Sequence, residues 1–235
     1  MPTVEPLLFV PGALCDARLY AHQLDHLGDV ARPVFVDVPD HDRVEAMAEA
    51  ILATAPERFG LVGLSLGGIL AFEIVRRAPD RVTRLALLAT TSELDPPPLQ
   101  AIRRASIAKV RGGGLDDQVR TVLPMLVGPA ASADEHLAAT VREMALGVGA
   151  ERYARQVEAI LHRPDPGDVL PRIACPTLIA CGRDDVVTSP ASHERLAARI
   201  EGARLAIIDD AGHLLPMEQP RAVTDVLRDW LVTTL

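Results

Sequence analysis

One strand-to-helix junction constrains the fold of this chain more than any other feature. The apolar run Phe59–Leu64 predicts a buried strand, and the apolar spacing of residues 69–77 predicts a helix directly after it. Ser65 stands at the junction, with Gly63 and Gly67 two positions away on either side. So short a turn strains the serine backbone and requires small neighbours. The pattern indicates a serine hydroxyl lifted clear of a sheet, although a serine that caps a helix fits the same residues.

Strands and helices alternate on both sides of this junction. The pattern predicts strands at 7–10, 34–38, 59–64, 82–89, 177–181 and 203–208. It predicts helices between them at 16–27, 44–55, 69–77 and 192–200, and another after the last strand at 221–231. Strands that are apolar on both faces are typical of parallel sheets covered by helices. We therefore expect an α/β fold with a doubly wound, mostly or wholly parallel sheet of about six strands, and without an N-terminal antiparallel hairpin.

The alternation is interrupted in the middle of the chain. Residues 92–171 show no strand pattern, and clusters of Pro and Gly separate four predicted helices at 99–110, 115–127, 134–146 and 151–161. An insertion between two strands of a parallel sheet is expected to lie over their carboxyl ends, where such sheets bind ligands. We expect a core of residues 1–91 and 172–235 and a helical cap, or lid, of residues 92–171.

A reactive serine needs two partners. Its hydroxyl is a poor nucleophile unless a histidine takes the proton and a carboxylate orients that histidine. His213 follows the last predicted strand and comes directly after Gly212, whereas the other six histidines fall on predicted helices or their edges. A histidine on a surface loop is the alternative interpretation. Asp184 and Asp185 both follow the preceding strand, and either could supply the carboxylate.

These segments together resemble the α/β-hydrolase superfamily over nearly the whole chain. The matching pieces are Phe9-Val10-Pro11-Gly12, Gly63-Leu64-Ser65-Leu66-Gly67-Gly68, Gly182-Arg183-Asp184-Asp185 and Gly212-His213. The order Ser65, Asp185, His213 matches the family order of nucleophile, acid and base. The resemblance implies that Ser65 attacks a carbonyl carbon, His213 moves the proton and Asp185 orients the imidazole, with Asp184 as the alternative acid.

The resemblance also implies an oxyanion hole made of two backbone amides. One belongs to Leu66 and the other to Ala13, with Leu14 as the alternative to Ala13. The family usually has His-Gly in the first turn, where this chain has Pro11-Gly12; the backbone donors do not depend on that histidine. The short N-terminal turn and helical cap are similar to small bacterial esterases of the pimeloyl-carrier methyl esterase type.

This resemblance implies a serine esterase that cleaves a small, largely apolar carboxylic ester through an acyl-enzyme, with no cofactor and no metal. The residues expected to line its substrate pocket are Leu14, Met125, Met144, Tyr153 and Leu214, although those in the cap could simply pack its helices together. Two alternatives remain. The same triad could act on a carbon–carbon bond, a lactone or a thioester, or the scaffold could serve as a non-catalytic ligand receptor.

Charge and composition limit the partners. A net charge of −8 argues against a nucleic-acid partner, because phosphate binding needs a basic surface. No apolar run approaches the ~20 residues of a membrane span, and no signal-like segment opens the chain, so we expect a cytoplasmic protein.

The first cap helix carries four basic residues, which could receive an acidic carrier protein or form a solvated face: Arg103, Arg104, Lys109 and Arg111. Cys15 follows the first strand and could line the mouth of the site.

Overall fold

A single sheet forms the centre of the computed structural model, which describes residues 5–233. Its six strands are β1 (Pro6–Val10), β2 (Arg32–Phe35), β3 (Phe59–Leu64), β4 (Val82–Leu88), β5 (Thr177–Gly182) and β6 (Arg204–Ile208). Their spatial order is β2-β1-β3-β4-β5-β6, and all five pairings within the described residues are parallel. The chain winds outward from β1 in one direction and then crosses over to wind in the other. The predicted doubly wound parallel sheet is confirmed.

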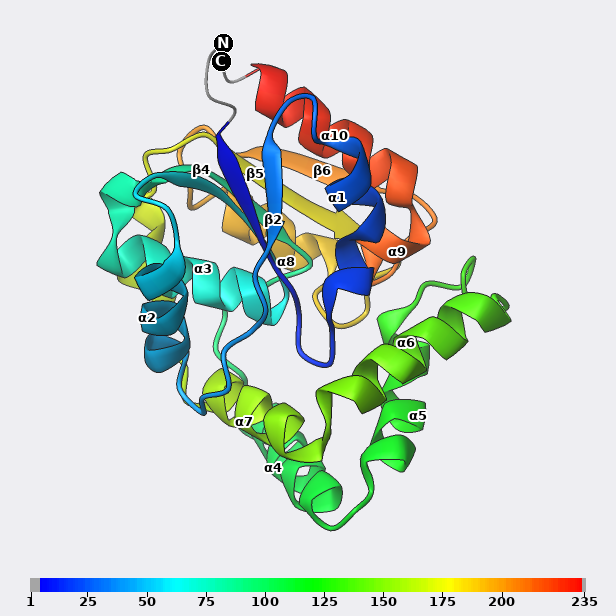
Figure 1. The fold of residues 1–235 in the computed structure, drawn as a ribbon. Helices are drawn as coiled ribbons and strands as arrows, with labels where there is room; N and C mark the ends of the chain where they lie inside the picture. The colour runs from blue at the N-terminus through cyan, green and yellow to red at the C-terminus, as the bar shows by residue number, and fades with distance from the viewer. Residues whose placement is uncertain (1–4, 234–235) are drawn as a thin grey trace.

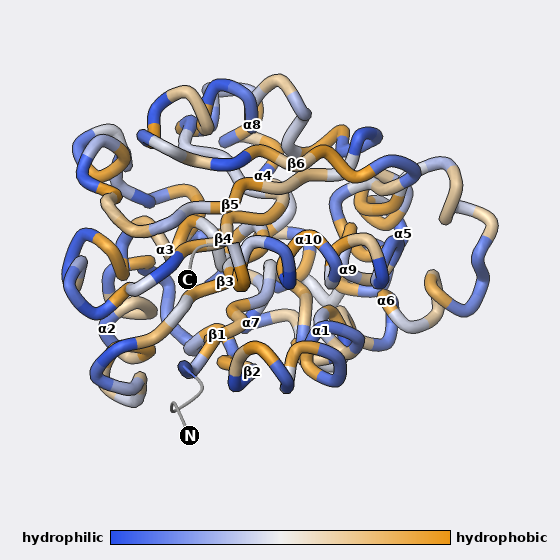
Figure 2. The backbone as a smooth tube through the Cα atoms, turned by 90° about the horizontal axis from the view of Figure 1, so that it is seen from above, coloured by the Kyte–Doolittle hydropathy of each residue, from blue (hydrophilic) through white to orange (hydrophobic). Residues whose placement is uncertain are grey.

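Helices cover both faces of the sheet (Figure 1). On one face lie α2 (Val44–Thr54), α3 (Leu66–Arg77) and α8 (Pro190–Ala197), which share a core with the strands. On the other face lie α1 (Ala21–His26), α9 (Leu215–Glu218) and α10 (Pro220–Thr233). The apolar residues concentrate along the central strands in Figure 2. Helix α3 is buried continuously from Leu66 to Val75, so the turn before it is set into the core.

Two elements differ in kind or extent from the prediction, one helix was not predicted, and most other bounds shift by one to three residues. The helix predicted at 16–27 begins as a 3-10 turn, η1 (Ala17–Tyr20), before α1, and Asp16 caps that turn by accepting a hydrogen bond from the Arg18 amide. Strand β2 ends at Phe35 instead of extending to residue 38, since it lies at the sheet edge and pairs with β1 only over four residues. Helix α9 was not predicted, because its four residues are too few to show helical spacing.

Four helices are inserted between β4 and β5: α4 (Pro97–Arg111), α5 (Leu115–Leu126), α6 (Glu135–Val148) and α7 (Ala150–Leu161). They lie beyond the carboxyl ends of the strands (Figure 1). A buried hydrogen bond of 3.0 Å joins the hydroxyl of Ser106 on α4 to that of Tyr153 on α7. The 3-10 turns η3 (Pro166–Asp168) and η4 (Leu170–Arg172) lead back to β5, and η2 (Pro79–Arg81) lies before β4. Among residues 5–233 we find no helix long and apolar enough to cross a membrane.

Candidate active site

Ser65 occupies a strained turn between β3 and α3. Its φ of 53° and ψ of −110° lie in a region that costs a non-glycine residue about 1–3 kcal/mol. The Ser65 amide donates to the carbonyl of Leu88 at 2.9 Å, which ties the turn to the end of β4. A methyl group on Gly63 would overlap the Gly67 carbonyl, and one on Gly67 would overlap the Val10 carbonyl. The two glycines therefore allow the backbone contacts that hold the serine in this conformation.

Asp185 and His213 are in direct contact. The Nδ1–H of His213 donates to Oδ2 of Asp185 at 2.9 Å, and both side chains are buried. Asp185 follows β5 and His213 follows β6, so both lie at the carboxyl ends of the parallel strands, as does Ser65 after β3. With its proton on Nδ1, the imidazole has a free lone pair on Nε2 and can act as a base. Asp185, rather than the half-buried Asp184, forms this bond.

The Asp185 carboxylate is held in its charged form by its neighbours. Burial alone would raise the pKa of Asp185, but the charge and hydrogen bond of His213, together with Thr188, hold it below the usual value. Oδ1 accepts from the amides of Val187 and Thr188, each at 2.8 Å, and Oδ2 accepts from the Thr188 hydroxyl at 2.8 Å. The carboxylate thus keeps one oriented lone pair for the imidazole.

A second, fully buried histidine supports the same region. His193 on α8 accepts from the Thr90 amide through Nε2 at 3.0 Å, and its Nδ1–H donates to the Ser189 carbonyl at 3.0 Å. The Thr90 hydroxyl in turn donates to the Ser65 carbonyl at 2.8 Å. Burial lowers the pKa of His193, so its neutral form is favoured. Hydrogen bonds therefore connect the serine turn with the loop that carries Asp185.

The loop after β1 lies against the serine. A Cβ on Gly12 would come within 3.4 Å of the Ser65 Cβ, so the turn before Ala13 passes directly beside the catalytic candidate. Leu14 has a positive φ of 62°, and its amide donates to the side-chain oxygen of Gln156 on α7 at 3.1 Å. Of the two amides considered for the second oxyanion donor, the Leu14 amide is thus already engaged. Leu66, which would supply the first, begins α3.

The predicted pocket residues fall into different environments. Leu14 and Tyr153 belong to one apolar cluster with residues of α4, α5 and α7. Met144 is fully buried and Leu214 almost so, both in the cluster under α10. Met125 is half-exposed at the end of α5. Cys15 is buried as well; burial raises the pKa of its thiol to about 12, and the thiol donates to the Ala13 carbonyl at 3.4 Å.

The basic side chains of α4 are paired with groups of the same chain. Arg103 binds Asp95, Lys109 binds Asp117 at 2.6 Å, and Arg111 binds Glu151 and Glu158 at 3.0 and 2.9 Å. Arg104 donates to the side-chain oxygen of Gln100 at 3.2 Å. These contacts neutralise much of the charge that an acidic partner would need.

Sequence reasoning missed four supporting residues: Thr90, Thr188, Gln156 and His193. His193 falls on a predicted helix or its edge like five other histidines, and its sequence position gives no sign of the hydrogen bond that it forms through each ring nitrogen. Thr188 had the clearest signal, since it lies three residues after Asp185 in the same loop.

Comparison with known proteins identifies the family over most of the chain. A family profile described as "Alpha/beta hydrolase family" matches residues 7–226. A pimeloyl-[acyl-carrier protein] methyl ester esterase of Neisseria meningitidis is 26% identical over 213 residues, which cover 83% of this chain and 67% of the relative. A putative carbamate hydrolase RutD of Rhizobium rhizogenes is 28% identical over 192 residues, covering 78% and 72%. The solved structure of a thermophilic esterase from Thermogutta terrifontis superposes with a TM-score of 0.89 at 30% identity, covering 99% of this chain and 91% of that one.

Proposed function

Because the chain belongs to the α/β-hydrolase family, we propose that it is a serine hydrolase that cleaves a small, largely apolar carboxylic ester through an acyl-enzyme intermediate. The observation that carries the proposal is the 2.9 Å hydrogen bond between His213 and Asp185, at the same sheet edge as the strained Ser65. Relatives named as esterases support the reaction class.

In the proposed first half-reaction, Nε2 of His213 takes the Ser65 hydroxyl proton as Oγ attacks the ester carbonyl carbon. The negative charge moves to the carbonyl oxygen, which the amides of Leu66 and Ala13 stabilise. Such a donor is typically worth about 3–4 kcal/mol in the transition state. The tetrahedral intermediate then collapses, and His213 returns the proton to the departing alcohol.

Water completes the cycle in the second half-reaction. His213 takes a proton from the water while the water oxygen attacks the acyl carbon. The bond between the acyl carbon and Ser65 Oγ then breaks, and His213 gives that proton to Oγ. The products are a carboxylic acid and an alcohol. Asp185 remains ionised throughout, and it stabilises the imidazolium and fixes the Nδ1 tautomer.

The substrate is proposed to be neutral and small. Apolar residues of the insertion pack around Leu14, beside the proposed oxyanion donor. The paired state of the basic side chains on α4 favours a small ester over an acidic carrier protein. In this proposal the insertion, residues 92–171, is the cap that limits the size of the acyl group, with Tyr153 and Met125 as its candidate lining.

The test is hydrolysis of p-nitrophenyl esters from acetate to decanoate, with wild type beside Ser65→Ala. We expect the substitution to lower kcat by several orders of magnitude, and the preferred chain length to report the size of the pocket. A wild type that is inactive on every ester while a fluorophosphonate still labels Ser65 would favour a carbon–carbon, lactone or thioester substrate. Full activity in Ser65→Ala would overturn the serine mechanism.

A further inference from the structure

Glu218 is a carboxylate that the proposed reaction does not use, yet it binds three backbone amides. It ends helix α9, five residues after His213. Its Oε2 accepts from the amides of Gly128 at 2.7 Å and Gly212 at 2.9 Å, and its Oε1 accepts from the Leu214 amide at 3.0 Å. Two of these amides flank His213 in sequence, and the third belongs to the segment after α5.

The His213 loop and the segment after α5 also touch each other directly. The amides of His213 and Leu214 both donate to the Leu126 carbonyl, each at 3.1 Å. A Cβ on Gly128 would come within 2.9 Å of the Gly212 nitrogen, so the two backbones lie in van der Waals contact. Figure 1 shows α9 on the side of the core that faces α5 and α6 of the insertion. The amides of Gly128 and Gly212 point at one oxygen, an arrangement that a carboxylate stabilises well.

We propose that Glu218 is a positioning residue that fixes the His213 loop against residues 126–128 of the helical insertion and so keeps the imidazole aligned for proton transfer. The inference rests on the proposed serine-hydrolase function. Without Glu218, His213 keeps its bond to Asp185, but the Gly212 amide loses its acceptor and the Leu214 amide keeps only the Leu126 carbonyl. A displacement of about 1 Å in a catalytic group can cost roughly 100-fold in rate.

The experiment compares wild type, Glu218→Ala, Glu218→Gln and Ser65→Ala on a p-nitrophenyl ester, at a temperature where melting curves show each to be folded. We expect kcat of Glu218→Ala to fall about 10- to 100-fold with KM within twofold. The kcat of Glu218→Gln should lie between those of wild type and Glu218→Ala, because its one carbonyl oxygen can replace only one of the two carboxylate oxygens as acceptor. The rate of fluorophosphonate labelling of Ser65 should fall in parallel.

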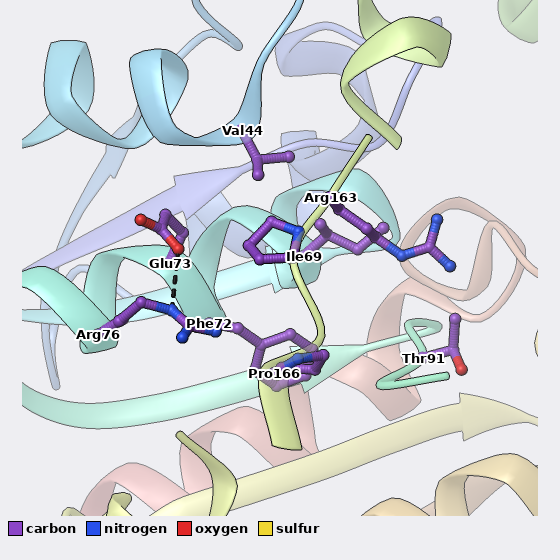
Figure 3. A pocket seen from close by; sticks show the side chains of 9 residues that line it. Val44, Ile69, Phe72, Glu73, Arg76, Thr91, Arg163 and Pro166 are labelled. Carbon is purple, nitrogen blue, oxygen red and sulfur yellow. Dashed lines mark ion pairs between the residues drawn. The ribbon is translucent and has the colours of Figure 1, made fainter. Parts of the chain in front are cut away.

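The matched control is Glu73→Gln. Glu73 is a buried carboxylate on α3, paired with Arg76 at 3.0 Å and Arg77 at 2.7 Å; Figure 3 shows its contact with Arg76 beside a pocket that none of the three catalytic candidates lines. This substitution should lower the melting temperature without changing kcat. If Glu218 were only structural, its variants would behave in the same way.

Four results would overturn the inference, and the last of them would overturn the proposed function as well. Wild-type kcat and labelling rate in folded Glu218→Ala would remove the positioning role while leaving the serine mechanism intact. A raised KM with unchanged kcat would make Glu218 part of substrate binding. If Glu218→Ala does not fold, Glu218→Gln decides alone, with unchanged kcat as the contrary result. Undiminished hydrolysis in Ser65→Ala would instead overturn the proposed function, and the role of Glu218 with it.

Discussion

The backbone amide of Leu14 donates a buried 3.1 Å hydrogen bond to the side-chain oxygen of Gln156. The two residues are 142 positions apart, one in the loop after β1 and the other on helix α7 of the insertion. The insertion therefore holds the loop that carries the proposed second oxyanion donor, Ala13. A shift of α7 would move that loop relative to Ser65.

Replacing Gln156 with methionine should test this contact. Methionine has a similar size but no acceptor, so the buried Leu14 amide loses its partner at a cost of about 1–3 kcal/mol. We expect a lower free energy of unfolding, measured in urea, together with a reduced kcat for ester hydrolysis. Gln118→Met, at another buried glutamine of the insertion, serves as control. Equal kcat in the two variants would separate Gln156 from the oxyanion loop.

Asp185→Asn should lower kcat by about 10⁴. The asparagine oxygen can replace Oδ1 and accept from the amides of Val187 and Thr188. Its NH₂ group then faces His213 Nδ1, which must become an acceptor, so the proton moves to Nε2 and the base is lost. Kinetics on a chromogenic ester measure the effect. The kcat of Asp184→Asn should stay within a few-fold of wild type. A large loss of kcat in that variant would mean that Asp184, and not Asp185, is the acid of the triad.

Thr188→Val should destabilise the protein by about 1.5–3 kcal/mol, since the Thr188 hydroxyl donates to a buried, ionised carboxylate. The same loss raises the pKa of Asp185 from its lowered value. Urea unfolding at neutral pH measures the free energy. Thr140→Val, at an exposed hydroxyl that donates to the His136 carbonyl within α6, should change it far less. A similar change in both variants would contradict the argument.

His193 should make the protein less stable in mild acid. Burial lowers its pKa below 6.5, so between the two values the unfolded chain binds more protons than the folded one. The free energy of unfolding should fall as the pH drops below about 6.5 and level off above it. Asp185 raises and His213 lowers the pKa of His193, and both residues are present in the wild type and in His193→Gln. In His193→Gln, unfolding measured from pH 8 to 5 should show a smaller fall; an unchanged fall would assign the effect to other groups.

The sequence predicted those parts of the molecule whose signals are local. Each strand of the sheet is a short apolar run, and Ser65, Asp185 and His213 each follow such a run by a few residues. Parallel pairing brings the carboxyl ends of these strands to one end of the sheet, so residues that follow different strands can lie close together there. The 2.9 Å contact between Asp185 and His213 follows from that topology.

Most of the supporting contacts could not be predicted because they join distant residues through backbone groups, although the contact of Thr188 with Asp185 is local. Glu218 and Gly128 are 90 positions apart, and His193 and Thr90 are 103 apart. An amide or carbonyl group is present at almost every residue, so its choice of partner has no signature in the sequence. Helix α9 was missed for a related reason, since four residues are too few to show a helical period.

The insertion leaves the sheet after β4 and returns to it at β5, and these two strands are direct neighbours. Ala89, at the exit, donates its amide to the carbonyl of Ala180 on β5 at 2.9 Å. The two strands that flank the inserted segment therefore pair directly with each other, and their pairing does not depend on the length of the chain between them. During evolution such a segment can be lengthened, shortened or exchanged as one unit; if it is the cap of the proposed function, substrate preference can diverge while the sheet and the residues at its strand ends are inherited unchanged.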